Sequence, residues 1–204
     1  LVLGGHRMIS FDRNPEAIQR VVDKGALGAR SLADFVRQLS LPRAIWLMVP
    51  SGDPVDQTIE QLLPNLSQGD ILIDGGNSKY KDSIRRAEKL KPHGIHFVDA
   101  GTSGGIWGLQ NGYCLMVGGE NAVVEHLEPI FKTLAPPDGY LHVGPVGAGH
   151  FVKMIHNGIE YGMLQAYGEG FELLKASQFK LDLGKISHLW NQGSVVRSWL
   201  LELA

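Results

Sequence analysis

Five polar side chains share one face of a helix predicted in the second half of the sequence. They recur at i, i+3, i+4, i+7 and i+8, the spacing at which an α-helix returns to the same side. The five are Lys153, His156, Asn157, Glu160 and Tyr161. Mostly apolar residues lie between them, so we expect the helix to be buried against protein on most sides. An amine, an imidazole and a carboxylate on such a rigid element are suited to proton transfer.

Lys153 is the candidate base of this set. A lysine acts as a base near neutral pH only if its pKa, ordinarily about 10.4, falls by about two to three units, and desolvation by an apolar helix has that effect. The alternative is a structural network in which Lys153 pairs with Glu160 and the Asn157 amide caps a neighbouring backbone group.

Strand and helix patterns alternate ahead of this helix and predict an α/β fold with a Rossmann-like, doubly wound sheet. We expect strands at 8–11, 44–49, 71–73, 96–98, 113–117 and 140–143, and helices at 15–24, 31–39, 55–66, 79–91 and 122–134. Helical patterns then cover 150–175, 182–191 and 194–203. We therefore predict a dinucleotide-binding domain at residues 1–148 and the start of an all-helical substrate and dimerisation domain at 149–204.

Asp12 follows the first predicted strand, where an acidic residue holds the ribose of a bound dinucleotide in Rossmann folds. The glycine fingerprint of such folds lies about 20 residues earlier, and no G-x-G-x-x-G precedes Asp12. We therefore expect the domain to lack its first strand and phosphate loop, which leaves two neighbouring strands unpaired. Asp12 favours NAD, because a carboxylate repels a 2′-phosphate, whereas Arg13 leaves NADP open. The alternative for Asp12 is a turn or N-cap residue ahead of Pro15.

Two glycine-rich segments follow predicted strands. Gly75-Gly76-Asn77 lets the backbone approach a ligand and presents one amide, although this triplet is also typical of a simple turn. In the segment Gly101-Thr102-Ser103-Gly104-Gly105, successive N–H groups and a hydroxyl can form a nest for a carboxylate. Ligands of open α/β sheets bind at the carboxyl ends of strands, so we expect both segments near the ligand.

The run G-x-x-G-x-G-H-x-x-K-x-x-H-N-x-x-E-Y-G at residues 144–162 resembles the β-hydroxyacid dehydrogenases. His156, Asn157, Glu160 and Tyr161 make it similar to the 6-phosphogluconate dehydrogenase branch in particular, and the similarity covers essentially the whole chain. The resemblance implies oxidative decarboxylation of 6-phospho-D-gluconate to ribulose 5-phosphate with NAD or NADP as cofactor. It implies catalytic roles for Lys153 and Glu160. The expected substrate contacts are Asn77, Ser103, Gly104, Gly105, His156, Asn157 and Tyr161, and the expected cofactor contacts are Asp12, Arg13, Val49 and Asn77.

Two other functions compete with this hypothesis. The first is a non-decarboxylating β-hydroxyacid dehydrogenase, for which only Lys153 and Asn157 matter. The second is a catalytically silent fragment that binds a nucleotide or a sugar acid. The lysine and arginine that grip the sugar phosphate in the family lie further along than residue 204, and we do not transfer their role to Arg197.

Composition favours a small-molecule partner. With a formal net charge of -2 and no basic run, we expect neither nucleic acid nor a membrane as a partner. The single cysteine, Cys114, excludes an internal disulfide and fits a reducing, cytoplasmic location, and its apolar neighbours predict a buried thiol. The eight histidines lack metal-ligand spacing, so we expect no metal site. The family likeness implies a homodimer or homotetramer that acts on a sugar-acid phosphate.

Overall fold

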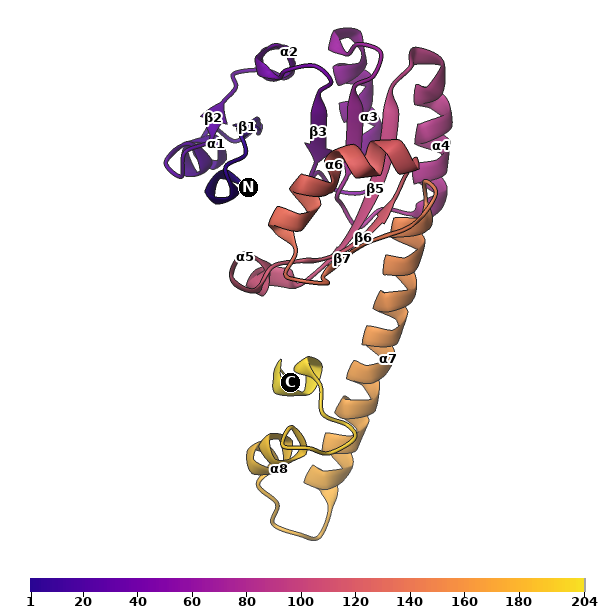
Figure 1. Ribbon diagram of the computed structural model, residues 1–204. Coiled ribbons are helices and arrows are strands. Elements are labelled where there is room, and N and C mark those ends of the chain that lie inside the picture. Colours follow the sequence, from indigo (N-terminus) through magenta and orange to yellow (C-terminus); the bar gives the residue numbers. More distant parts are fainter. Residues whose placement is uncertain (204) are drawn as a thin grey trace. The chain divides into compact units, whose positions relative to one another are not determined.

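The computed structural model describes residues 1–203 of the chain. They form two compact units, Leu1–Lys153 and the residues from Met154 onward, and helix α7 (Ala148–Ala176) belongs partly to each (Figure 1). No helix among residues 1–203 is long and apolar enough to span a membrane.

The first unit contains two sheets (Figure 1). The smaller sheet is a parallel pair of β1 (Ile9–Ser10) and β2 (Leu27–Gly28). The larger one has the order β3 (Ala44–Leu47), β4 (Ile71–Asp74), β5 (His96–Ser103), β6 (Cys114–Gly118) and β7 (Tyr140–Gly144). Within residues 1–203, no hydrogen-bonded strand pair joins β1 to β3. The sequence did not predict β2.

Helices cover both faces of the larger sheet, which confirms the predicted Rossmann-like α/β fold. One apolar core joins the sheet to α2 (Leu32–Gln38), α3 (Asp53–Leu62) and α4 (Tyr80–Leu90). A second core joins the opposite face to α6 (Asn121–Leu134). On β4, Leu72 enters the first core while Ile71 and Ile73 enter the second, as the twofold alternation of a strand requires.

The helix ends follow local capping chemistry. Asn14 caps α1 (Pro15–Val22) by accepting the Glu16 N–H at 2.9 Å. Ser31 caps α2 through the Asp34 N–H at 3.1 Å. The predicted helix 55–66 divides into α3 and a short 3-10 turn at Leu63–Asn65, because Pro64 cannot donate the next helical hydrogen bond.

Strand β5 is longer than the sequence predicted. We expected residues 99–105 to form a loop, but β5 continues to Ser103 and pairs with β6. The two strands are antiparallel, unlike their neighbours. The connection between them holds only a 3-10 turn and the four-residue α5 (Gly108–Asn111), too little for the crossover helix that a parallel pair needs.

Cys114 corrects a second expectation. Its side chain is exposed rather than buried, because it is the first residue of β6 and pairs with Ser103, the last residue of β5. The apolar core of the strand begins one residue later, at Leu115.

Three helices make up the second unit: the later part of α7 (Ala148–Ala176), α8 (Leu183–Trp190) and α9 (Trp199–Leu203). The Phe171 and Trp190 rings pack with their centroids 5.8 Å apart, and Leu201 is fully buried. The last helix is shorter than the predicted 194–203. Gly193 has a φ of 102°, and the Tyr167 hydroxyl donates to the Val196 carbonyl at 2.8 Å, so the chain before Trp199 is held in a non-helical path.

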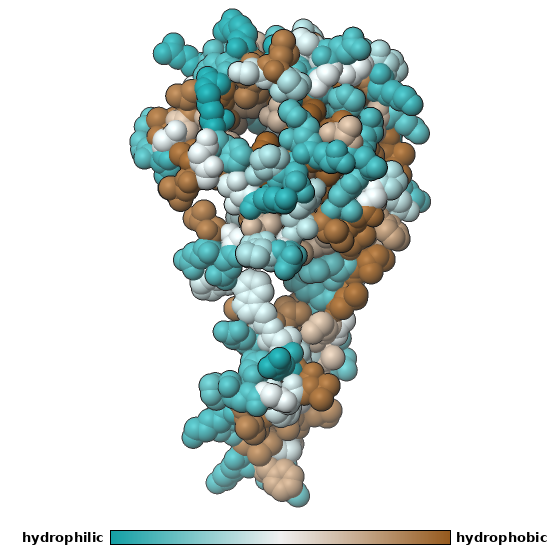
Figure 2. Space-filling view, in the orientation of Figure 1, coloured by the Kyte–Doolittle hydropathy of each residue, from teal (hydrophilic) through white to brown (hydrophobic). Residues whose placement is uncertain are grey.

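The apolar side chains of α7 are not buried as the sequence predicted. Ile155 and Ile159 are 48% and 61% exposed, and other apolar residues of the helix are also open to solvent. Apolar surface lies along α7 in Figure 2. The apolar side chains of α7 therefore form a surface that the described residues leave exposed to solvent.

Candidate active site

Polar groups of the first unit gather where β3, β4 and β5 end. The loops after β3 and β4 lie side by side, because a methyl group added to Gly76 would lie 3.3 Å from the Val49 carbonyl oxygen. Val49 is half-buried, whereas Asn77 is exposed at the tip of its loop. Both candidate cofactor contacts therefore belong to the same edge of the sheet.

The side chain of Arg86 holds these two loops in place. Its guanidinium is buried and donates to Asp74 Oδ2 at 3.2 Å, to both Asp56 oxygens at 3.1 Å and to the Gly52 carbonyl at 3.0 Å. Asp74 Oδ1 in turn accepts the Gly76 N–H at 3.1 Å. One buried cation thus connects α3 and α4 with the loops that carry Val49 and Asn77.

Partial burial raises the pKa of Asp56, but hydrogen bonds and charges from Arg86 and Arg85 outweigh it and lower the pKa to about 2. The carboxylate is consequently ionised throughout the physiological pH range and keeps the buried guanidinium paired.

The start of α7 is held by a carboxylate from β5. Asp99 is fully buried, and its two oxygens accept the N–H groups of Gly147 at 2.6 Å and His150 at 2.7 Å. Burial raises the pKa of Asp99, while hydrogen bonds from those N–H groups act in the opposite direction. The first N–H groups of a helix have no intrahelical acceptor, so Asp99 supplies the cap from another element.

Glycines bring α7 into direct contact with the sheet. A methyl group on Gly149 would lie 2.5 Å from the carbonyl oxygens of Asp99 and Met116. One on Gly101 would lie 2.6 Å from Lys153 Cβ. Lys153 is only 9% exposed, and its stem therefore rests on the carboxyl half of β5. The predicted base is buried, as its proposed chemistry requires.

Ser103, Gly104 and Gly105 lie just beyond this contact. Ser103 ends β5 and pairs with Cys114, so most of the predicted nest is strand backbone rather than free loop. Gly104 and Gly105 leave the ladder with φ angles of 127° and 51°, which favour glycine. Their N–H groups, rather than those of residues 101–103, remain suited to a carboxylate.

The other four predicted residues of the stripe belong to the second unit. There the His156 Nδ1 lies 3.6 Å from Glu160 Oε2 and 3.3 Å from Asn157 Oδ1. His156 and Glu160 are about equally half-buried, and Tyr161 is 72% exposed. The imidazole, the amide and the carboxylate are thus adjacent on α7.

Asp12 and Arg13 are exposed just beyond the carboxyl end of β1. Asp12 Oδ1 accepts the Asn14 N–H at 2.7 Å, so the turn contact considered from the sequence exists, while the N-cap itself is Asn14.

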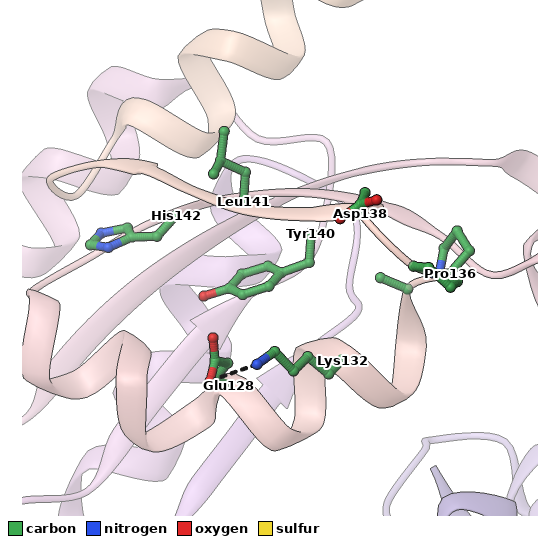
Figure 3. Close-up of a pocket in the computed structure, with 9 residues that line it drawn as sticks. Glu128, Lys132, Pro136, Asp138, Tyr140, Leu141 and His142 are labelled. Carbon is green, nitrogen blue, oxygen red and sulfur yellow. Dashed lines mark ion pairs between the residues drawn. The ribbon is translucent and has the colours of Figure 1, made fainter.

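A groove of about 570 Å³ lies elsewhere, between α6 and β7 (Figure 3). Its walls include Tyr140 and the ion pair of Glu128 with Lys132, whose charged atoms are 3.0 Å apart. No predicted site residue lines it. Within residues 1–203, no cluster of three His, Cys, Asp or Glu side chains is arranged to hold a metal ion.

Sequence reasoning missed the polar residues that support the site: the buried Asp74, Ser83, Arg86, Asp99 and His150, and the partly buried Asp56. One sequence signal was available for Asp74 and Asp99, because each places a charged residue at the end of an apolar run that is predicted to be a buried strand. Arg86 carried no such signal, since arginine is ordinary on an amphipathic helix.

Comparison with known proteins assigns the family. Residues 1–145 match the model of the NAD binding domain of 6-phosphogluconate dehydrogenase. The chain belongs to the 6-phosphogluconate dehydrogenase family. Residues 149–204 match the model of the 6-phosphogluconate dehydrogenase C-terminal domain.

Relatives in the 6-phosphogluconate dehydrogenase family support this assignment. The NAD(+)-dependent, decarboxylating enzyme of Haloferax volcanii is 48% identical over 98% of this chain and 66% of its own length. The NADP(+)-dependent enzyme of Bacillus subtilis is 42% identical over 95% of this chain and 42% of its length. The crystallised enzyme of Plasmodium falciparum matches with a TM-score of 0.89 and 29% identity over 98% of this chain and 45% of that one. The chain thus spans about two thirds or less of these relatives.

Proposed function

We propose that the protein oxidatively decarboxylates 6-phospho-D-gluconate to ribulose 5-phosphate with NAD as cofactor. The observation that carries the proposal is a buried lysine, Lys153, against the carboxyl half of β5. Lys153 is followed at helical spacing by His156, Asn157 and Glu160. The relatives named for this reaction support the same assignment.

The first step in this proposal is oxidation at C3. Neutral Lys153 accepts the proton of the C3 hydroxyl, and His156 and Asn157 orient that hydroxyl and the lysine. A nicotinamide bound beside this site would supply the acceptor for the hydride that leaves C3. The product is a β-keto acid whose carboxylate is one carbon away from the new ketone.

Loss of carbon dioxide follows from the position of that ketone. As the bond between C1 and C2 breaks, its electron pair moves toward the ketone oxygen and leaves an enediol. Protonated Lys153 donates to this oxygen and stabilises its developing charge. Glu160 then protonates the carbon that lost the carboxylate while the enol oxygen returns its proton to Lys153, which restores the ketone and gives ribulose 5-phosphate. Tyr161 lies near the phosphate end of the substrate.

Residues at three strand ends fit a dinucleotide. Asp12 is exposed after β1, where it can accept the ribose hydroxyls. Val49 and Asn77 occupy the adjacent loops after β3 and β4 and line the nicotinamide side. Asn77, Ser103, Gly104 and Gly105 contact the substrate. NAD is the preferred cofactor because of Asp12, and Arg13 allows some use of NADP.

The exposed apolar side chains of α7 support self-association as a homodimer or homotetramer. We assign residues 1–148 to cofactor binding and 149–204 to a helical substrate and dimerisation domain. A cytoplasmic location fits the single, exposed thiol.

The decisive experiment mixes the full-length protein with NAD and 6-phosphogluconate and measures NADH and carbon dioxide together. Equal amounts of the two products are expected. NADH without carbon dioxide would instead indicate a non-decarboxylating β-hydroxyacid dehydrogenase, and no NADH would reject both enzymes.

Lys153→Met tests the base. Methionine keeps the apolar stem but cannot move a proton, so turnover should fall by about two to four orders of magnitude, while substrate affinity measured by calorimetry stays close to that of the wild type. Near-normal turnover would remove Lys153 from the catalytic role.

A further inference from the structure

We propose that Asp99 is a positioning residue for Lys153: it fixes the first turn of α7 on β5 and thereby sets where the lysine amine is presented. The inference rests on the proposed function for the role of Lys153. The placement of Asp99, His150 and Lys153 comes from contacts within the first unit alone.

The contacts that hold α7 on β5 come from alternate residues of the strand. Asp99 and Gly101 are two residues apart on β5 and so face the same side of the sheet. On α7, His150 and Lys153 are three residues apart and lie on one face of the helix. Asp99 accepts the His150 N–H, and Gly101 lies under the Lys153 stem. One pair of strand residues thus meets one pair of helix residues.

Asp99 determines this contact more directly than packing does. Its two oxygens accept one N–H each, from Gly147 and from His150, at 2.6 and 2.7 Å. Two short hydrogen bonds to one rigid carboxylate fix both the position and the rotation of the first helical turn. A rotation there would be transmitted to Lys153, which is on the next turn of the same helix.

A second contact fixes the same turn from α4. The His150 Nδ1 lies 2.8 Å from the Ser83 hydroxyl, and both side chains are buried. The His150 ring also approaches Asp99 Oδ2, with Nδ1 at 4.0 Å. His150 therefore joins α4, α7 and β5 at one point beneath the proposed base.

If stability were the only requirement, a buried carboxylate would be an unfavourable way to hold a helix, because its burial costs free energy. Ionised groups resist removal from water, and well-packed apolar residues often serve stability equally well or better. The carboxylate instead fixes the orientation of the helix, because a hydrogen bond has a preferred angle and apolar packing does not. Directional control is needed one turn before a residue that must meet a reacting hydroxyl.

The test compares two buried aspartates in the full-length protein. Asp70 matches Asp99 in burial and also accepts two backbone N–H groups, those of Arg43 at 2.9 Å and Ser67 at 2.8 Å. Unlike Asp99, it also pairs with an arginine, Arg43, whose Nη1 lies 2.7 Å from Asp70 Oδ2. It precedes β4, at the amino end of the sheet and away from Lys153. In each case asparagine replaces one acceptor oxygen by an NH2 group, so Asp70→Asn reproduces the chemical change without touching α7.

We expect Asp99→Asn to lower kcat by about 10- to 100-fold, the size that a misplacement of about 1 Å produces, with KM changed less than about threefold. Asp70→Asn also loses the charge paired with Arg43, so it should lower the melting temperature by at least as much but leave kcat within about twofold at a temperature where both variants are folded. Equal kcat values for the two variants would overturn the proposal.

A readout that needs no substrate separates this inference from the proposed function. Competitive acetylation with acetic anhydride, followed by mass spectrometry, measures the reactivity of the Lys153 amine relative to the surface lysines. Asp99→Asn should change the Lys153 labelling rate several-fold, and Asp70→Asn should not. If the wild type lacks activity, the proposed reaction fails, while the labelling result still decides the role of Asp99.

Asp99→Ser provides a variant for the case in which Asp99→Asn does not fold. Serine is smaller and retains one acceptor oxygen without a competing amide, so it should preserve part of the cap. Its kcat and Lys153 labelling should lie between those of the wild type and Asp99→Asn, or below the wild type if it is the only folded variant. Wild-type values for both would overturn the proposal.

Discussion

Gly101→Ala tests the contact between α7 and β5 with a single methyl group. The added carbon would lie 2.6 Å from Lys153 Cβ and 2.8 Å from the Gly149 carbonyl oxygen. Carbon atoms pack at about 3.5–4.0 Å, so α7 must retreat by roughly 0.9 Å or more. Both obstacles belong to helix backbone or to a carbon fixed to it, and neither can rotate away.

This displacement has two measurable consequences. Overpacking of a close contact costs about 1–3 kcal/mol of folding free energy, and each kcal/mol lowers the melting temperature of a protein of this size by about 2–4 °C. The shift also moves Lys153 by nearly 1 Å from the hydroxyl that it is proposed to deprotonate, which in that role lowers turnover by about 10²-fold. A 10²-fold loss corresponds to about 2.7 kcal/mol of transition-state stabilisation, so turnover and stability should fall by comparable free energies.

Gly168→Ala is the matched control, because it adds the same methyl group to α7 where nothing lies within 4 Å. Alanine is favoured over glycine within a helix by about 1 kcal/mol, so this variant should be as stable as the wild type or more stable. The assay follows NADH with saturating NAD and 6-phosphogluconate, alongside thermal unfolding by circular dichroism. A Gly101→Ala protein with wild-type kcat and melting temperature would refute the close contact.

Two further predictions concern the network around Arg86. The pKa of Asp56 is about 2 in the folded protein against 3.8 for the free side chain, so the stability from its ionised form is present above pH 4 and is lost as the pH falls toward 2. Asp56→Asn should remove about 2 kcal/mol of this acid-dependent stability in urea titrations, and an unchanged pH profile would contradict the pairing. Arg86→Met should cost about 3–5 kcal/mol, because the buried Asp74 loses its cation. Adding Asp74→Asn should restore part of that loss in a double-mutant cycle, whereas additive effects would deny the contact.

The sequence was sufficient to predict most of the longer elements and the family-specific helix, because both depend on local periodicity. Strong alternation of apolar runs and glycines located β3, β4 and β7 to within one or two residues at their ends. The polar spacing on α7 predicted a shared face for Lys153 and Glu160 before any contact was known. Patterns of this kind involve residues of a single segment of the chain.

Contacts between distant segments could not be predicted in the same way. Residues 99–103 contain glycine, serine and threonine and look like a loop, yet pairing with β6 makes them a strand. The cap on α7 comes from Asp99, 48 residues before the N–H of Gly147 that it accepts. The position of Asp99 after an apolar run marks it as unusual, but no local pattern identifies the helix that it caps, and Arg86 carries no local signal at all.

Asp74 and Asp99 explain how two candidate site residues keep a constant separation. The two aspartates are paired residues on the adjacent parallel strands β4 and β5, so both side chains point to the same face. Asp74 holds the loop that carries Asn77 through the Gly76 N–H, and Asp99 holds the helix that carries Lys153. The separation of the two anchors is set by the spacing between strands, about 4.8 Å. Strand spacing is among the least adjustable dimensions of a protein, so anchoring both segments to it limits how far the Asn77 amide and the Lys153 amine can move relative to each other.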